Sequence, residues 1–395
     1  MGKPWLTIVG ISEDGLNALS DASRKAITEA TIVFGGQRHL ELAGCPEKGR
    51  PWPVPFSVDE VLQHRGAPVV VLASGDPFWF GAGTTIVRHL KPEDWQCMQS
   101  VSTFSLAASR LGWGINEVQC LGLHAEPIET LYPLLSENER FICLLRDGNA
   151  VNSLARWLVK QGFEKSDFIV LERLGGPFEK ITHCKLNEEI SEHFEAPVAV
   201  ALTARGNKGL PCSGGLDDEH FFNDGQITKK PVRALTLSAL APRKNEILWD
   251  IGAGSGSISV EWLLSAEGSR AYAIEQHKSR SENIQLNASK FGLQKRLHIK
   301  TMTAPDGLKE LESPDAVFFG GGFSRELFDT VWTTVPVSTR IVVNSVTLES
   351  QSLVTLLQSQ YGGNLMRFDI SAAEPLGRMR TWKSSRSIIQ WSVVK

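Results

Sequence analysis

The sequence has few cysteines, and their arrangement suggests neither a metal site nor a disulfide framework. Its six cysteines are scattered over 395 residues, and no two of them form a C-x-x-C pair. Structural zinc sites and disulfide-stapled domains need paired or regularly spaced cysteines. We therefore predict no metal site. Isolated thiols are typical of a reduced, cytoplasmic protein.

Long apolar runs and an excess of positive charge are also missing. The most apolar window, 66–87, is interrupted by Pro68 and by the turn Gly75-Asp76-Pro77, so it does not predict a membrane span. The first residues do not resemble a signal peptide. The net charge of −3 provides no global positive field for nucleic acid. We expect a cytoplasmic protein that binds neither membranes nor nucleic acid and holds anionic ligands with local basic residues.

The length of 395 residues favours two domains. Predicted strands alternate with helical stretches along the whole chain, which indicates an α/β fold. The stretch 206–225 is rich in glycine and acidic residues and has no hydrophobic period, so we interpret it as a linker between domains 1–205 and 226–395. The second domain has seven predicted strands: 246–251, 270–275, 297–300, 315–319, 339–344, 364–370 and 387–394. A short polar loop is expected between the last two.

A glycine-rich segment in the second domain predicts a cofactor site. Asp250-Ile-Gly252-Ala-Gly254-Ser-Gly256 follows a short apolar run and leads into a helix-like stretch, so it reads as strand, turn and helix. A side chain at these glycines would block the close approach of a ligand to the backbone. Glu275 ends the next apolar run, where a carboxylate can accept from both hydroxyls of a ribose. An adenosine-type cofactor is therefore predicted.

The spacing of the glycines indicates which cofactor it is. A dinucleotide fold needs G-x-G-x-x-G, but Ser257 occupies the third glycine position here and the acidic Asp250 precedes the motif. The pattern resembles motif I of class I S-adenosylmethionine (SAM) methyltransferases. SAM carries a cationic sulfonium and an ammonium group but no phosphate, so nearby carboxylates favour the binding of SAM and do not repel it. A dinucleotide site and a purely structural glycine turn remain as alternatives.

Four segments of the first domain place small residues after predicted strands. They are 10–16, 74–78, 102–107 and 171–177. Taken singly, each reads as an ordinary strand-to-helix turn. Together they resemble the tetrapyrrole methylase family, the class III SAM methyltransferases. The resemblance implies a two-lobed α/β domain with a second SAM site lined by matching residues: Gly75, Asp76, Ser102, Thr103 and Leu174. Ser12, where the family usually has glycine, and Ala125-Glu126, where relatives tend to have glycine and arginine, depart from the family pattern.

The pairing of the two domains resembles the fused corrinoid methyltransferases of cobalamin (vitamin B12) biosynthesis. Further segments carry this resemblance in the second half: 224–229, 231–234, 248–262, 304–305, 319–322 and 344–349. It implies methylation of a precorrin macrocycle at carbon 5 by the first domain. The second domain would methylate carbon 15 and decarboxylate the ring C acetate. A SAM site in each domain and a homo-oligomer are implied as well.

The site residues of the second domain follow from the motif and the resemblance. SAM would be held by Asp250, Gly252, Gly254, Gly256, Glu275, Ala304 and Gly320. Substrate carboxylates would be held by Lys229, Arg233, Arg378 and Arg380, and Gly321 would leave room for the ring edge. The alternative for these charges is a solvated surface. No residue is predicted as a catalytic acid or base.

Two other functions remain open at this point. One is a SAM-dependent methyltransferase that acts on RNA or protein, because class III domains also serve such substrates. The loop at 320–322 lacks the Asp/Asn-Pro-Pro-aromatic motif of enzymes that methylate base amino groups. The other is a chain with one inactive SAM-binding domain, and Ser12 makes the first domain the candidate.

Overall fold

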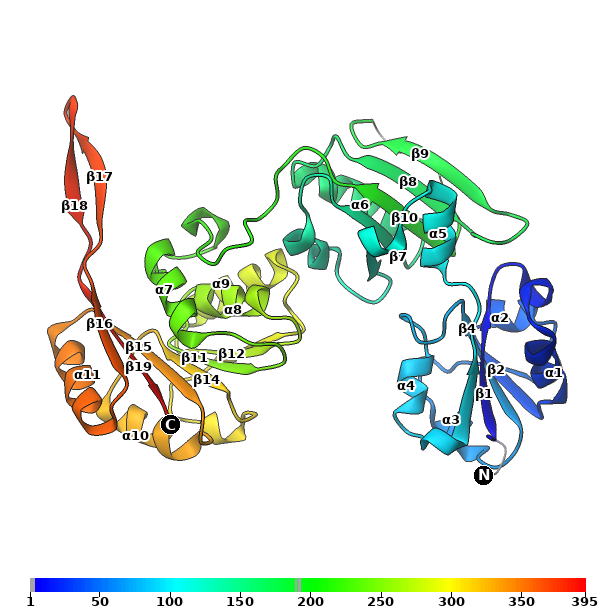
Figure 1. The fold of residues 1–395 in the computed structure, drawn as a ribbon, viewed down its shortest axis with the longest axis horizontal. Helices are drawn as coiled ribbons and strands as arrows, with labels where there is room; N and C mark the ends of the chain where they lie inside the picture. Colours follow the sequence, from blue (N-terminus) through cyan, green and yellow to red (C-terminus); the bar gives the residue numbers. More distant parts are fainter. Residues whose placement is uncertain (1–3, 189, 191–192) are drawn as a thin grey trace. The chain divides into compact units, whose positions relative to one another are not determined.

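The chain folds into two compact units, which the computed structural model describes over residues 4–188, 190 and 193–395 (Figure 1). The first unit comprises Met1–Pro127 and Leu135–Lys208. The second comprises Ile128–Leu134 and Gly209–Lys395. Both are built from α/β layers, which confirms the predicted fold class. Among the described residues, no helix is both long enough and apolar enough to cross a membrane.

The first sheet of the first unit is fully parallel and has the strand order β3-β2-β4-β1-β5. Its strands are β1 (Leu6–Ile11), β2 (Ile32–Gly35), β3 (Gly49–Pro51), β4 (Val69–Ser74) and β5 (Trp95–Met98). Its helices are α1 (Asp21–Glu29), α2 (Gln37–Leu42), α3 (Asp59–Gln63) and α4 (Gly83–Val87). Ile8 and Val9 enter different apolar clusters, so both faces of β1 are buried.

The second sheet of this unit is mixed and has the order β6-β7-β10-β8-β9. Its strands are β6 (Gln119–Gly122), β7 (Arg140–Leu145), β8 (Asp167–Glu172), β9 (Lys180–Lys185) and β10 (Val198–Thr203). The helices are α5 (Thr103–Leu111) and α6 (Gly148–Lys160). Asp147 begins α6 by accepting from the amide of Ala150 at 2.9 Å. The apolar stripe of α6 is buried: Val151, Leu154, Ala155 and Leu158.

The second unit has one seven-stranded sheet in the order β13-β12-β11-β14-β15-β19-β16. Its strands are β11 (Ile247–Ile251), β12 (Arg270–Glu275), β13 (Leu297–Thr301), β14 (Ala316–Phe319), β15 (Arg340–Ser345), β16 (Asn364–Phe368) and β19 (Ile388–Val394). All seven correspond to predicted strands. The first five in the sheet order are parallel, and β19 runs antiparallel to both neighbours.

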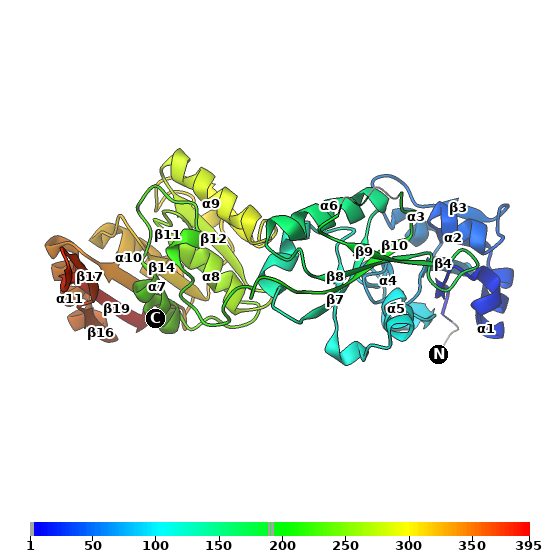
Figure 2. The ribbon, with the colours of Figure 1, turned by 90° about the horizontal axis from the view of Figure 1, so that it is seen from above.

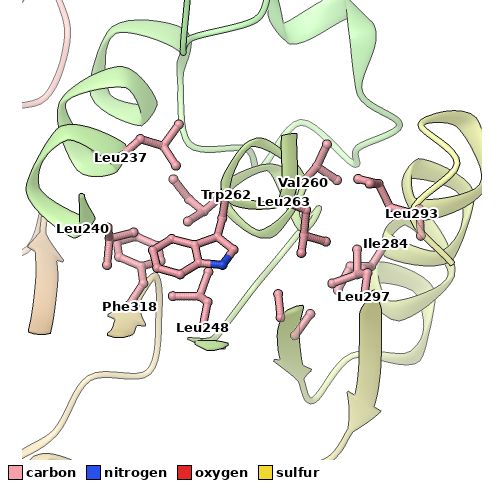
Figure 3. Packing of buried hydrophobic residues seen from close by; sticks show 14 of the residues in the cluster. Leu237, Leu240, Leu248, Val260, Trp262, Leu263, Ile284, Leu293, Leu297 and Phe318 are labelled. Atoms are coloured by element: carbon pink, nitrogen blue, oxygen red, sulfur yellow. The ribbon is translucent and has the colours of Figure 1, made fainter. Parts of the chain in front are cut away.

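Helices cover both faces of this sheet: α7 (Lys230–Leu240), α8 (Ser257–Ser265), α9 (Lys278–Lys290), α10 (Arg325–Thr334) and α11 (Leu348–Tyr361). Leu248 packs toward α7, α8 and α9, whereas Ile247 and Trp249 pack toward α10 and α11. Figure 2 shows α8 and α9 beside β11 and β12. In Figure 3, Trp262 of α8 lies among Leu237, Leu240, Leu248 and Phe318.

Short 3-10 turns complete both units: η1 (Gly15–Ala18), η2 (Pro92–Asp94), η3 (Ile115–Glu117), η4 (Ile128–Leu134), η5 (Asp218–His220) and η6 (Leu308–Glu310).

Two segments differ from the sequence-based expectation. The loop between β16 and β19, expected to be short and polar, contains a hairpin of β17 (Ser371–Leu376) and β18 (Met379–Ser384), which projects from the sheet in Figure 1. The stretch 206–225, expected to be a linker, is partly built into the second unit. Leu216 and Phe221 are buried in its core, although their spacing gives no periodic signal.

Candidate functional site

The second unit contains a cavity of about 840 Å³ at the carboxyl ends of its parallel strands. Several of the predicted SAM residues line it: Gly252, Gly254, Glu275, Ala304 and Gly320, with Gly321 beside them. Open α/β sheets bind ligands at this edge, and a cavity of this size accommodates a small-molecule ligand. The structure therefore brings together most of the residues that the motif predicted.

The floor of the cavity is formed by two turns whose backbones touch. Gly252 has a φ of +71°, and a Cβ at this position would lie 2.6 Å from the carbonyl oxygen of Gly321. A Cβ on Gly320 would lie 2.8 Å from the carbonyl oxygen of Gly252. Any side chain at these positions would push the turns apart and fill the space between them. Gly256 does not line the cavity, but a Cβ there would meet Ile284 of α9 at 2.9 Å.

Glu275 stands at the end of β12 and fixes the glycine turn. Its Oε2 accepts from the amide of Gly254 and its Oε1 from the amide of His277, both at 2.9 Å. Only 4% of the residue is exposed, yet it lines the cavity. Each carboxylate oxygen retains a lone pair for a further donor. The geometry therefore fits a carboxylate that accepts from ligand hydroxyl groups.

Asp250, predicted as a cofactor residue, does not line the cavity. It is 1% exposed, and its Oδ2 accepts from the amide of Ser259 at 3.2 Å and from its hydroxyl at 2.6 Å. Burial raises the pKa of Asp250 to about 7, the two bonds from Ser259 oppose this rise, and the charge of Glu275 adds to it. Asp250 therefore ties β11 to the first turn of α8, behind the glycines.

The predicted segments of the first unit also converge. Gly75 has a φ of +52°, and a Cβ on it would lie 2.9 Å from the carbonyl oxygen of Val101 and 3.0 Å from the Cα of Ser102. Ser102 caps α5, which Thr103 begins, by accepting from the amide of Ser105 at 3.1 Å. Asp76 accepts from the amide of Phe78 at 2.9 Å.

The turn after β8 joins the same place in the first unit. Leu174 is buried with Phe104 of α5 in one apolar cluster. A Cβ on Gly176 would lie 2.5 Å from the Cβ of Glu13. The segments after β1, β4 and β8 and the start of α5 therefore meet, as the resemblance implies for a SAM cleft.

Basic residues that the sequence analysis missed lie beside this place. Arg38 forms an ion pair with Glu13, and the Nε2 of His39 lies 2.8 Å from the hydroxyl of Ser74. Burial, assisted by the charge of Arg38, lowers the pKa of His39 to about 4, so its imidazole is neutral at pH 7. Arg38 and His39 follow Gly35-Gly36 at the end of β2, a strand-to-helix glycine turn that was not among the four segments considered.

Comparison with known proteins identifies the family. The family model described as tetrapyrrole (corrin/porphyrin) methylases matches residues 6–189, and that described as precorrin methyltransferase domain matches residues 219–395. The precorrin-6Y C(5,15)-methyltransferase (decarboxylating) of a Sinorhizobium species is 41% identical, covering 100% of this chain and 97% of that protein. The protein of the same name from Mycobacterium tuberculosis is 34% identical and covers 99% of this chain and 100% of its own length.

The chain belongs to the precorrin-6Y C(5,15)-methyltransferase (decarboxylating) family. A solved structure of the C-terminal domain of such an enzyme from Rhodobacter capsulatus is 52% identical. It covers 47% of this chain and 100% of that chain, with a TM-score of 0.46. As a member of this family, the chain is a SAM-dependent methyltransferase, which confirms the predicted class of enzyme.

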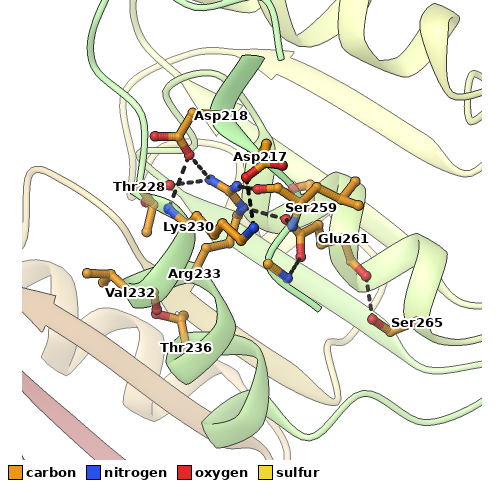
Figure 4. Close-up of polar contacts among 12 residues, drawn as sticks. Asp217, Asp218, Thr228, Lys230, Val232, Arg233, Thr236, Ser259, Glu261 and Ser265 are labelled. Carbon is orange, nitrogen blue, oxygen red and sulfur yellow. Dashed lines mark hydrogen bonds and ion pairs between the residues drawn. The ribbon is translucent and has the colours of Figure 1, made fainter. Parts of the chain in front are cut away.

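Arg233, predicted to bind substrate in this methyltransferase, is placed where no substrate reaches it. It is fully buried (0% exposed), and its Nε donates to Glu261 at 2.5 Å (Figure 4). Its other nitrogens bond to Asp218 at 3.2 Å and to the carbonyls of Thr228 and Leu216. Among these partners only Thr228 lines the cavity. Arg233 therefore supports the cavity wall at Thr228 without lining the cavity itself.

The remaining predicted substrate residues are distributed differently. Lys229 lines the cavity and forms an ion pair with Asp218 at 3.3 Å. Arg378 lies in the turn of the β17–β18 hairpin and Arg380 in β18, and neither lines the cavity. Further polar residues that the sequence did not assign to the site also line the cavity, among them Gln226, His277, Arg280, Asn344 and Arg386.

The burial of Arg233 makes a prediction about stability. Arg233→Met leaves Glu261 buried without its cation, and we expect it to lower the free energy of unfolding by about 3 kcal/mol. The matched variant Lys229→Met removes a cation whose side chain is 63% exposed, and we expect a loss below about 1 kcal/mol. Chemical denaturation of the full chain measures both. Equal stability of Arg233→Met and the wild type would contradict the buried role.

Proposed function

We propose that this chain methylates a precorrin macrocycle at carbons 5 and 15 and decarboxylates its ring C acetate, in cobalamin biosynthesis. The proposal rests on full-length similarity to precorrin-6Y C(5,15)-methyltransferases (decarboxylating). The single structural observation that supports it is the cavity at the carboxyl ends of the parallel strands, where the glycine floor and the Glu275 carboxylate would suit SAM.

We further propose two SAM sites, one in each unit. In the second unit, Gly252, Gly254, Ala304 and Gly320 would leave room for the cofactor, and Glu275 would accept from its ribose hydroxyls. In the first unit, Gly75, Asp76, Ser102, Thr103 and Leu174 would form the site. Ser12 is not among the residues with positive φ, so its turn forms without glycine and without backbone strain. This observation supports an active first unit.

The task of the protein in such a reaction is alignment. When bound, SAM supplies an electrophilic methyl group, so no strong base is needed to activate the donor. Gly320, Gly321 and Gly322 leave open space at the end of β14, where a flat ring edge can approach. Loss of carbon dioxide leaves the electron pair of the broken bond in the conjugated ring. The ring becomes more electron-rich, and decarboxylation is in this way coupled electronically to methylation at carbon 15. Holding the two reactants together while excluding water accounts for most of the acceleration expected.

The mass of the product tests this function. The purified chain is incubated anaerobically with SAM and the reduced precorrin substrate, and the product is analysed by mass spectrometry. We expect a gain of two methyl groups and the loss of one carbon dioxide. A gain of one methyl group with decarboxylation would contradict the activity assigned to the first unit. An unchanged substrate would contradict the proposal as a whole.

We also propose a homo-oligomer, as the resemblance implies. β17 and β18 pair only with each other among the described strands, and an isolated two-stranded ribbon is marginally stable. The hairpin exposes Leu376, Met379 and Trp382, the last of these by 73%. Contact between copies would bury these side chains. Sedimentation equilibrium of the full chain is expected to give a multiple of 43.4 kDa, and a monomer mass would contradict this proposal.

A further inference from the structure

The cavity of the second unit is lined by several side chains that carry or can carry charge. Lys229 is paired with Asp218 at 3.3 Å, and Arg280 with Asp224 at 2.8 Å. Arg386 differs from both. It is exposed, and in the part of the chain that the structure describes it has no hydrogen bond or ion pair. Arg386 therefore lines the cavity with a guanidinium whose donors are not taken up by described protein groups.

Arg386 lies far from Glu275, the carboxylate proposed to bind the ribose of SAM. β19 runs antiparallel to β15, with Ile389 opposite Ser345, so Arg386 lies just before β19 at the edge where the parallel strands end. The order β12-β11-β14-β15-β19 puts four strand steps between Glu275 and Arg386, which is roughly 19 Å at a strand spacing of about 4.8 Å. The glycines after β14 lie between them.

The backbone around Arg386 is held in place while its side chain is not. The amide of Ser385 donates to the carbonyl of Ile370 at 2.8 Å. Asp369, the acidic residue at the same end of the hairpin, is engaged by Ser387 and by Arg367 at 3.0 Å. It is therefore not available to neutralise Arg386. The base of the hairpin thus fixes the backbone position from which the unpaired Arg386 side chain extends at the cavity wall.

We propose that Arg386 binds a carboxylate of the macrocyclic substrate, at the end of the cavity away from the ribose site. This inference rests on the proposed function. A guanidinium offers donors in a fork that matches a carboxylate, which favours a two-point contact. A carboxylate bound in this way is stabilised in its charged form, which opposes its loss as carbon dioxide. Arg386 therefore anchors a carboxylate that the substrate retains, and not the acetate that leaves.

The test follows carbon dioxide release by the full chain under steady-state conditions. We expect Arg386→Gln to raise the KM for the macrocycle about tenfold, the loss of one charge-assisted contact, with a much smaller change in kcat. Arg386→Lys should recover part of this loss. The matched control is Arg325→Gln, which removes an arginine that pairs with Asp329 on the surface of α10, outside the cavity. The control should leave the KM unchanged.

The methionine carboxylate of SAM has the same chemistry, so the affinity for S-adenosylhomocysteine is measured by calorimetry on the same variants. We expect it to stay within about twofold of the wild type. A weakened affinity with an unchanged KM for the macrocycle would assign Arg386 to the cofactor and overturn the inference. An unchanged KM in an Arg386→Gln chain that releases carbon dioxide would also overturn it, while leaving the proposed function intact. A wild-type chain that releases no carbon dioxide would contradict the proposed function itself.

Discussion

The second unit depends on a close backbone contact between the turn after β11 and the loop after β14. The atoms of Gly252 and Gly321 are so near that a Cβ on Gly252 would lie 2.6 Å from a carbonyl oxygen. The same turn is bound to the end of β12, because the amides of Gly252 and Ala253 donate to the carbonyl of Ile274. Three neighbouring strands are thus joined at their carboxyl ends by backbone contacts, to which the Glu275 carboxylate adds its bond from the amide of Gly254. The space above them is left free of side chains, which makes the cavity.

Buried polar groups hold the walls around this floor. Asp250 binds the first turn of α8 through Ser259, so the helix begins directly behind the glycines. Arg233 and Glu261 bind the segment 215–228 from two helices. Removing one member of such a buried group leaves the other without compensation, so these contacts act together. The cavity is therefore shaped by residues that mostly do not face it.

The sequence predicted the features that are encoded locally. The glycine motif specifies its own turn, since Gly252, Gly254 and Gly256 all have positive φ. The seven strands were found because their apolar runs are short and separated by clear breaks. Asp250 was assigned to the cavity. Alternate residues of a strand face the same side of the sheet, so Asp250 of β11 points to the same side as Leu248, toward α8. A stricter use of that alternation would have predicted its burial.

Features that depend on distant partners could not be predicted in this way. The role of Arg233 depends on Glu261, which is 28 residues away in the chain and faces it only once α7 and α8 have packed. The β17–β18 hairpin has exposed residues on both strands, so it lacks the alternation that marks a strand against a core. Arg386 was missed for the same reason. It follows the hairpin, and only the pairing of β19 with β15 brings it to the cavity.

The proposed activity requires two separate SAM sites, one in each unit. Calorimetric titration of the full chain with S-adenosylhomocysteine tests it most directly, with Gly252→Ala and Gly75→Ala as partner variants whose folding is checked by circular dichroism. We expect two sites per wild-type chain and one in each variant, since the Cβ added at Gly252 or at Gly75 collides with the backbone of a neighbouring turn in one unit only. A single site in the wild type that one variant abolishes and the other leaves unchanged would contradict it.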